Sequence, residues 1–247
     1  MRVRDKILLD IKGLAEHGPI NIVILGDSVS HGTVLDNNDY ENVYWNVLKK
    51  KMNAYRDYMP VNMICASIGG TMAKDALPRV DKQVLSHDPD LVIVCFGLND
   101  INGPLEEYVG ALREIFSKCV NAGVDTIFMT PNMLNTRVVE DAPQKWAWYA
   151  VETAKMQNEG KMDRYMEAAK AVAREMGVTV CDCYAKWKEM EKAGEDITMM
   201  LVNRINHPTS ELHKLFADEL YKLIIGEEEC YVANDSGMYQ GEVNQGE

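Results

Sequence analysis

Short apolar runs rich in β-branched residues alternate along the chain with longer segments in which apolar residues recur every three or four positions. The short runs predict five β-strands, and the longer segments predict helices. The runs are almost continuously apolar, as expected for strands of a parallel sheet whose two faces are both covered. The predicted strands are Ile20 to Leu25, Val61 to Ala66, Leu91 to Phe96, Asp125 to Met129 and Val178 to Cys181.

Two of the longer segments repeat apolar residues with the 3.6-residue period of an amphipathic helix. A third helix is predicted to begin near Asn38, because Glu41 follows it at the spacing of a capping box, and the last helix is predicted over 210–225. Strands that alternate with helices favour an α/β fold, namely a three-layer α/β/α sandwich around a five-stranded parallel sheet. The predicted inward stripes are Leu105, Tyr108, Val109, Leu112, Ile115, Phe116, Cys119 and Val120; Met162, Tyr165, Met166, Ala169, Val172, Ala173 and Met176; and Tyr40, Val43, Tyr44, Val47, Leu48 and Met52.

Two segments depart from this pattern. The stretch 131–160 is long for a connection after a strand, and it contains Trp146 and Trp148. Either it folds over a pocket, or it is a surface helix whose tryptophans pack on the body or on another subunit. The stretch 227–247 holds six acidic residues and no Lys or Arg, which is typical of a solvated tail. Since no linker or repeat divides the rest, we expect one domain over 1–226 followed by a flexible acidic tail.

The charge balance excludes several classes of partner. The chain has 26 Lys and Arg against 38 Asp and Glu, a net charge of −12, of which six units lie in 227–247. Nucleic acids and anionic membranes attract clustered cations, and no basic patch occurs, so neither is an expected partner. The longest apolar run, Leu91 to Leu98, is too short for a transmembrane helix, and charges interrupt the apolar residues near the N-terminus. We therefore expect a cytoplasmic protein.

The six cysteines mostly lie in apolar stretches, which is typical of reduced, buried thiols. We expect no disulfides. Cys181 and Cys183 are two residues apart, but no second ligand pair stands at zinc-binding spacing, so no structural metal is predicted.

The candidate chemistry begins where the first predicted strand runs into Gly26-Asp27-Ser28-Val29-Ser30-His31-Gly32, at the sheet edge where parallel α/β folds bind ligands. This segment lacks the lysine of a phosphate-binding loop and the glycine spacing of a dinucleotide fingerprint. It also lacks the Gly-x-Ser-x-Gly elbow of α/β-hydrolases, because Ser30 stands where the second glycine is required. After these three motifs are excluded, the remaining interpretation is a serine nucleophile in a motif of another kind.

Four blocks, in order over nearly the whole chain, carry a resemblance to the SGNH hydrolases, also called the GDSL esterase/lipase superfamily. This resemblance implies a flavodoxin-like arrangement of the five strands. Singly, Ser28 and Asn99 are readable as helix caps, Gly70 as a turn glycine and His207 as a satisfied histidine. Their joint occurrence at strand ends and helix starts, in the family's order, favours the catalytic interpretation. The blocks are Gly26-Asp27-Ser28, Cys65-Ala66-Ser67-Ile68-Gly69-Gly70-Thr71, Gly97-Leu98-Asn99-Asp100 and His207-Pro208.

The resemblance implies a role for each block in acyl transfer, a reaction that requires a nucleophile, a base and donors for the oxyanion. Ser28 would attack the ester, and His207 would take its proton and pass it to the leaving alcohol. The backbone N–H groups of Ser28 and Gly70, together with the side-chain amide of Asn99, would form the oxyanion hole.

One position departs from the family pattern. The family usually has an Asp three residues before the catalytic histidine, and this chain has Arg204 there. We hypothesise a Ser28–His207 dyad in which a backbone carbonyl of residues 203–206 holds the imidazole N–H. Asp182, at the end of the fifth predicted strand, is the alternative orienting group. Arg204 either faces the substrate or pairs with a surface acid.

The sequence thus predicts a carboxylic-ester hydrolase that forms an acyl-serine intermediate without a metal or organic cofactor. A short-chain acetylesterase acting on a carbohydrate is the first expectation, because flat tryptophans suit sugar faces and no long apolar lid helix is present. A lysophospholipase or thioesterase, and a catalytically silent glycan-binding module, are the alternatives. The expected partner is a small-molecule or carbohydrate ester, and nothing in the pattern indicates an oligomeric state. The candidates for lining the substrate pocket are Asp27, His31, Arg204, Trp146 and Trp148.

Overall fold

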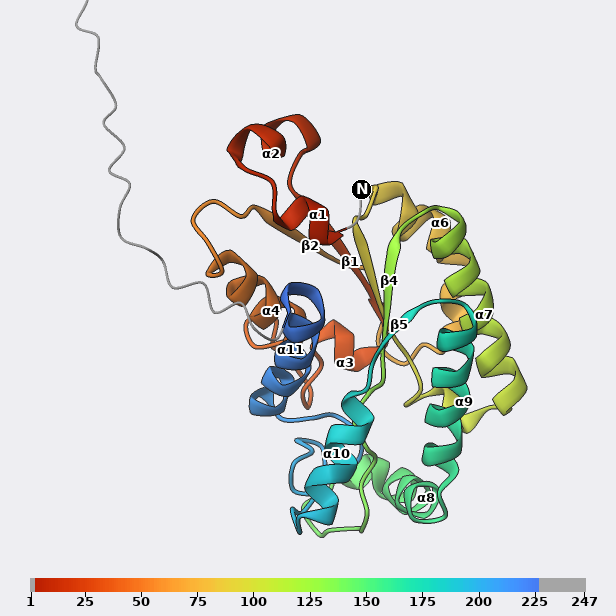
Figure 1. Cartoon of the computed structure of the whole chain (residues 1–247). Coiled ribbons are helices and arrows are strands. Elements are labelled where there is room, and N and C mark those ends of the chain that lie inside the picture. The colour runs from red at the N-terminus through yellow and green to blue at the C-terminus, as the bar shows by residue number, and fades with distance from the viewer. Residues whose placement is uncertain (1–2, 227–247) are drawn as a thin grey trace, which may run out of the picture.

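A computed structural model describes residues 3–226, so the acidic stretch 227–247 lies outside the described residues. Five parallel strands form one sheet in the order β2-β1-β3-β4-β5 (Figure 1). This order is the flavodoxin-like one, and it confirms the predicted fold class. Each strand begins and ends within one or two residues of the predicted bounds. The strands are β1 Ile20–Gly26, β2 Val61–Cys65, β3 Leu91–Cys95, β4 Asp125–Met129 and β5 Thr179–Cys181.

The two central strands hold the apolar middle of the molecule. All five residues of β3 are buried, as are six of the seven residues of β1, because helices cover both faces of the sheet. The chain leaves β1 to one side for β2 and then returns to the other side of β1 for β3. This reversal opens a crevice at the carboxyl ends of β1 and β3, which is where such folds bind ligands.

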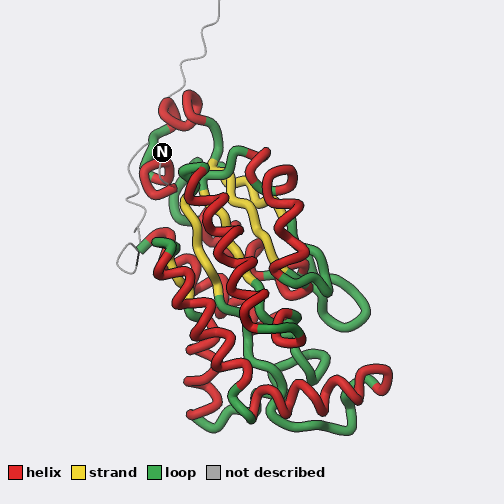
Figure 2. Tube along the Cα trace, turned by 90° about the vertical axis from the view of Figure 1, so that its right-hand side faces the viewer, coloured by secondary structure: helices red, strands yellow, loops and turns green. Residues whose placement is uncertain are grey.

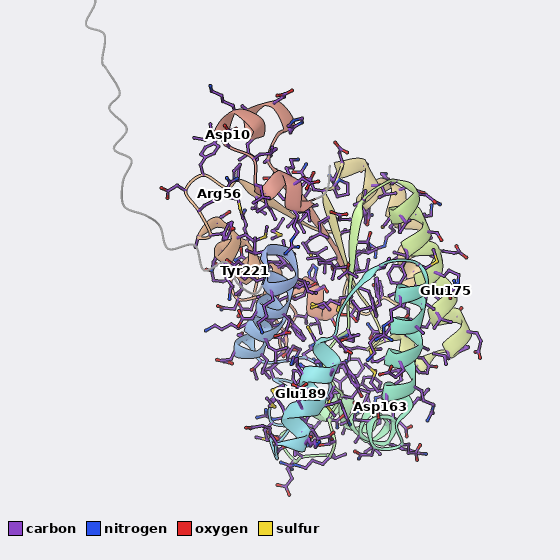
Figure 3. All side chains as sticks on the ribbon, viewed as in Figure 1. Asp10, Arg56, Asp163, Glu175, Glu189 and Tyr221 are labelled. Atoms are coloured by element: carbon purple, nitrogen blue, oxygen red, sulfur yellow. The ribbon has the colours of Figure 1, made fainter. Side chains whose placement is uncertain are left out.

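Helices form a layer on each face of the sheet. The helices α4 and α11 pack on each other on one face, and α7 and α9 do so on the other (Figures 1 and 2). Arg113 of α7 and Glu175 of α9 form a two-pronged ion pair with N–O distances of 2.7 Å, and Glu175 is labelled in Figure 3. The α-helices are α1 Val3–Ile7, α2 Ile11–His17, α3 Ser28–His31, α4 Tyr44–Asn53, α5 Ala73–Ala76, α6 Val80–Gln83, α7 Leu105–Asn121, α8 Ala147–Asn158, α9 Lys161–Glu175, α10 Cys183–Lys192 and α11 Ser210–Ile225. Four 3-10 turns are η1 Leu77–Arg79, η2 Leu85–His87, η3 Asp100–Asn102 and η4 Gln144–Trp146.

The predicted helix start near Asn38 is wrong, because α4 begins at Tyr44. The side chain of Asn38 accepts a hydrogen bond from Thr33 and donates one to the hydroxyl of Tyr40, so it is not available to cap a helix. The backbone N–H of Asp39 donates to the carbonyl of Gly32, and this bond folds the segment back on the end of α3. Tyr40, predicted to face inward, is therefore 51% exposed.

Five cysteines fall within the described residues, and all five are free thiols. Four of them are buried, while Cys65 on the edge strand β2 is exposed. Among the helices of residues 3–226, none has the length and apolarity needed to cross a membrane.

His213 generates a prediction about stability and pH. It is buried on α11 beside Tyr44, and burial lowers the pKa of its imidazole from 6.5 to about 4. In the folded protein the ring stays neutral down to about pH 4, whereas the unfolded chain takes up a proton below pH 6.5, so stability falls as the pH drops through this window. At pH 5 the wild type should lose on the order of 1–2 kcal/mol more unfolding free energy than His213→Gln.

Urea unfolding of both proteins at pH 7 and pH 5 measures this difference. The buried carboxyls Asp27 and Asp100 titrate in the opposite sense, but they are common to both proteins and cancel in the comparison. The prediction would be contradicted if the difference in unfolding free energy between wild type and variant were the same at the two pH values.

Candidate active site

Ser28 is placed at the crevice by the tight ending of β1. Gly26, the last residue of the strand, lies so close to β3 that an added Cβ would stand 2.7 Å from the carbonyl oxygen of Cys95, so no larger residue fits. Asp27 then caps α3, and its Oδ1 accepts the N–H of Val29 at 3.0 Å. Ser28 is the first residue of α3, so its own N–H lies at a helix N-terminus, where donors point outward.

His207 meets Ser28 from the far end of the chain. The Oγ of Ser28 lies 2.9 Å from Nε2 of His207, although the two residues are 179 positions apart. The Nδ1 of His207 lies 2.9 Å from the backbone carbonyl oxygen of Val34. A carbonyl only accepts hydrogen bonds, so the imidazole proton is on Nδ1 and Nε2 is free to accept the serine proton. This is the tautomer that a general base requires.

The group that orients His207 differs from the prediction. A backbone carbonyl does hold the ring, but it belongs to Val34, in the loop after α3, and not to residues 203–206. The latter segment instead fixes the backbone of His207. Oδ1 of Asn203 accepts the N–H groups of Ile205, Asn206 and His207 at 2.9–3.1 Å.

Asp182, the alternative orienting group, does not contact His207. Its carboxylate caps α10 through the N–H of Ala185 at 3.1 Å, accepts a hydrogen bond from Thr130 and pairs with the buried Lys170 at 2.6 Å. These partners lie after β4, in α9 and in α10, so none of them belongs to the segment around His207. The expectation that Asp182 orients the imidazole is therefore not met.

The predicted oxyanion donors gather around Ser28. Gly70 has a φ of +77°, in the left-handed region that favours glycine, and it lies in the same cavity lining as Ser28. The side-chain Nδ2 of Asn99 donates one hydrogen to the carbonyl of Thr71 at 3.0 Å, which fixes the amide plane and leaves its second hydrogen available. Asp100 joins the two loops, because its Oδ1 accepts the N–H of Ala73 at 2.8 Å.

The cavity that is lined by Ser28, Gly70, Asn99 and His207 has a volume of about 510 Å³. One wall comes from the segment 131–160, whose η4 and α8 lie past the carboxyl ends of the strands (Figure 1), and it contributes Trp146 and Trp148 to the lining. Trp146 and Trp148 are 47% and 63% exposed, so neither is a core residue. The position of the segment matches the interpretation that it folds over a pocket, and not the one in which its tryptophans pack on the body.

Several further lining residues were not singled out as candidates from the sequence, among them Lys145, Asn102 and Tyr149. Lys145 pairs with Asp36 at 2.8 Å, and Asn102 donates to the hydroxyl of Tyr149 at 3.0 Å. The position of Asn102 three residues after Asn99 is the only sequence signal for any of them, since one helical turn brings both amides to one side.

Three predicted lining residues lie outside the cavity lining. Asp27 is buried beneath Ser28, and His31 bonds the carbonyl of Ser67 and the hydroxyl of Tyr40. Arg204 turns to the surface, where it pairs with Asp141 at 2.9 Å and donates to the carbonyls of residues 199 and 201. The alternative that Arg204 pairs with a surface acid is the observed one.

Burial controls the titration of the groups around Ser28. It lowers the pKa of His207, against the raising effect of the hydrogen bond to Val34. Burial also raises the pKa of Asp27 to about 7 and that of Asp100 to about 6. The second carboxylate oxygen of each Asp has no hydrogen-bond partner among residues 3–226, as suits a carboxyl that holds a proton near neutral pH.

The family model of the GDSL-like lipase/acylhydrolases matches residues 24–215, from β1 to α11. This chain belongs to that family. It is accordingly a carboxylic ester hydrolase. The match includes all four sequence blocks and ends in the last helix, so it spans the whole of the site described above.

Solved structures of similar fold include two acetylxylan esterases and an α/β hydrolase. Acetylxylan esterase Axe2 from Geobacillus stearothermophilus has a TM-score of 0.66 and 20% identity over 85% of this chain and 95% of its own. The acetyl xylan esterase AlAXEase has a TM-score of 0.64 and 16% identity over 83% of this chain and 99% of its own. LAE5, an α/β hydrolase from the metagenome of Lake Arreo, Spain, has a TM-score of 0.65 and 19% identity over 84% and 95%. No curated protein sequence matches the chain.

Two further observations concern a second cavity and the side chains that could bind a metal ion. A second cavity, of about 540 Å³, lies at the opposite edge of the sheet, and its described lining includes no serine, cysteine or histidine side chain. Within residues 3–226, no cluster of three or more His, Cys, Asp or Glu side chains is arranged to hold a metal ion.

The titration of His207 gives a prediction for the pH profile of hydrolysis. The base must be neutral to accept the serine proton, and burial holds its pKa below 6.5, so kcat/KM should fall on the acidic side with a midpoint below pH 6.5. The double variant Asp27→Asn/Asp100→Asn keeps an oxygen for the N–H groups of Val29 and Ala73 and removes both neighbouring titrations. An acidic limb that persists in this variant therefore reports His207. A midpoint at or above pH 6.5 would contradict the prediction.

Proposed function

We propose that this hydrolase removes short acyl groups, acetyl above all, from carbohydrate esters, with Ser28 as nucleophile and His207 as general base. The observation that carries the proposal is the single cavity in which the Ser28–His207 hydrogen bond, the oxyanion donors and two exposed tryptophans meet.

In the first step Oγ of Ser28 attacks the ester carbonyl carbon, and its proton passes to Nε2 of His207. The carbonyl oxygen becomes an oxyanion, held by the N–H groups of Ser28 and Gly70 and by the free amide hydrogen of Asn99. The intermediate collapses, the bond to the alcohol oxygen breaks, and His207 gives its proton to that oxygen. Ser28 is then acylated.

Water completes the cycle. His207 takes a proton from the water as its oxygen attacks the acyl-serine carbon, and the oxyanion forms again in the same donors. His207 returns the proton to Oγ of Ser28 as the carboxylic acid leaves. During each attack the imidazolium is stabilised by the Val34 carbonyl dipole and not by a carboxylate.

The lining combines polar groups with apolar faces, as a sugar with hydroxyls around an apolar ring face requires. Beside the nucleophile stand the amides of Asn102, Asn203 and Asn206 and the hydroxyl of Thr33. The two exposed tryptophans offer flat apolar faces of the kind that stack on sugar rings. The acetylxylan esterases among the solved structures of similar fold support acetyl as the acyl group. A lysophospholipase or thioesterase is the alternative, which a preference for long acyl chains would favour.

Hydrolysis of p-nitrophenyl acetate tests the assigned roles. Ser28→Ala should lower kcat by at least ~10³-fold, because no other nucleophile stands in its place, and Asn99→Ala by about 10²- to 10³-fold through the loss of one oxyanion donor. Asp182→Asn should stay within about twofold of the wild type, because Asn can still cap α10 and Asp182 does not contact His207. Hydrolysis that survives Ser28→Ala, or an Asp182→Asn loss as large as that of His207→Ala, would overturn the assignment.

A series of p-nitrophenyl esters tests the acyl preference. With acetyl, butyryl, octanoyl and palmitoyl esters, kcat/KM should be highest for acetyl and fall with chain length, as for the acetylxylan esterases whose fold this chain shares. A maximum at octanoyl or beyond would replace the acetylesterase proposal with a lysophospholipase or thioesterase.

A further inference from the structure

Tyr149 is the one phenol in the lining of the active-site cavity, and its hydroxyl has a defined donor direction. Its neighbour is Asn102, whose Nδ2 lies 3.0 Å from the backbone carbonyl oxygen of Asn99 and 3.0 Å from the hydroxyl oxygen of Tyr149. The carbonyl of Asn99 can only accept, so the side of the amide that faces it must be the NH₂ group. Both amide hydrogens are thereby used, one on each oxygen.

The hydroxyl of Tyr149 is consequently an acceptor toward Asn102, and its own hydrogen must point elsewhere. No acceptor for that hydrogen is present among residues 3–226, in which the hydroxyl makes only the contact with Asn102. Since Tyr149 lines the cavity that holds Ser28, its hydroxyl hydrogen is left to point into that cavity. A phenol stays protonated at neutral pH, and burial raises the pKa of this one further.

The backbone of Tyr149 is held firmly enough to aim this donor. Oγ1 of Thr153 donates to the carbonyl of Tyr149 at 2.8 Å, and the amide of Asn135 donates to the carbonyl of the next residue, Ala150, at 2.9 Å. The ring lies 5.4 Å from that of Trp148, centroid to centroid. The donor and the exposed aromatic faces therefore belong to one rigid stretch at the start of α8.

We propose that Tyr149 is a specificity-determining residue whose O–H donates a hydrogen bond to an oxygen of the carbohydrate part of the ester, with Asn102 as its positioning residue. This inference rests on the proposed carbohydrate esterase function. Tyr149 does not act on the reacting carbonyl, because the oxyanion donors are already supplied by Ser28, Gly70 and Asn99. It selects esters whose alcohol part bears oxygen atoms beside the scissile bond.

Two substrates separate binding of the alcohol part from chemistry. One is an O-acetylated methyl glycoside with free hydroxyls, and the other is p-nitrophenyl acetate, whose alcohol part has no sugar oxygen. Tyr149→Phe should lower kcat/KM on the glycoside by roughly 3- to 10-fold, the effect of one neutral hydrogen bond, mostly through KM. On p-nitrophenyl acetate the same variant should lose less than on the glycoside, so the ratio of the two activities should fall.

Tyr165→Phe is the matched control. Its hydroxyl donates to the carbonyl of Gly103 at 2.5 Å, next to Asn102, and Tyr165 is not in the cavity lining. It should therefore leave the ratio of the two activities unchanged. Asn102→Ala should lower the ratio as Tyr149→Phe does, and the double variant should lose little more than either one, because Asn102 acts on the sugar through Tyr149.

The outcomes are distinct. An equal loss of Tyr149→Phe on both substrates, or no loss on the glycoside, overturns this inference while Ser28-dependent hydrolysis by the wild type stands. Additive losses in the double variant overturn the role of Asn102. If the wild type has no Ser28-dependent hydrolysis of either substrate, the proposed function itself fails.

Discussion

The hydrogen bond from Nδ1 of His207 to the carbonyl of Val34 is the contact on which the geometry around Ser28 depends. It fixes the tautomer, and through the tautomer it leaves Nε2 to accept from Ser28. A carbonyl dipole can orient an imidazole as a carboxylate does, but it carries no net charge to stabilise the imidazolium. Burial therefore dominates, and the pKa of His207 lies below its ordinary value. The imidazole therefore stays neutral further into acid than an exposed histidine.

Because the orienting group is backbone, the loop that carries it has to be held in place. The loop closes on itself through the N–H of Val34, which donates to the carbonyl of Asn37. From Thr33 a chain of side-chain hydrogen bonds runs through Asn38, Tyr40 and His31 to the carbonyl of residue 67, in the second sequence block. His31 thus supports the loop from outside the cavity. The same chain is the reason why Asn38 does not start a helix.

Electrostatics around the nucleophile contrast with the charge of the whole chain. A net charge of −12 would oppose a developing oxyanion if it were concentrated at the site. Instead, the described cavity lining contains no Asp or Glu, and the two buried carboxyls nearest Ser28 have raised pKa values. Asp36 and Asp141, close by in the loops, are each paired with a cation. Within residues 3–226, the negative charge is therefore not concentrated in the cavity lining around Ser28.

The sequence was sufficient to predict the strands and to single out Ser28, Gly70, Asn99 and His207, which the fold brings to one cavity, because alternating patterns and short blocks are properties of the linear chain. It could not predict Val34, since any residue has a backbone carbonyl and only the fold decides which one meets the imidazole. Tyr149 was equally hidden, because its significance depends on where the amide of Asn102 points. The predicted helix start near Asn38 was wrong for a related reason, since hydrogen bonds of Asn38 with Thr33 and Tyr40 outweighed the local capping signal.

The two halves of the cavity are tied together by buried hydrogen bonds, so neither is held independently of the other. The half that holds Ser28 is anchored on β1, on the loops after β2 and β3 and on the loop before α11. The tryptophan-bearing segment 131–160 is anchored on that last loop, because Asn132 donates to the carbonyl of Asn206 at 2.8 Å and the N–H of Asn135 donates to that of Ile205 at 2.9 Å. The exposed ion pair between Lys145 and Asp36 also joins the halves, but such pairs contribute little. Changes at the buried base of the segment should consequently reach the loop of His207, whereas changes at its exposed side chains should leave the Ser28–His207 contact undisturbed.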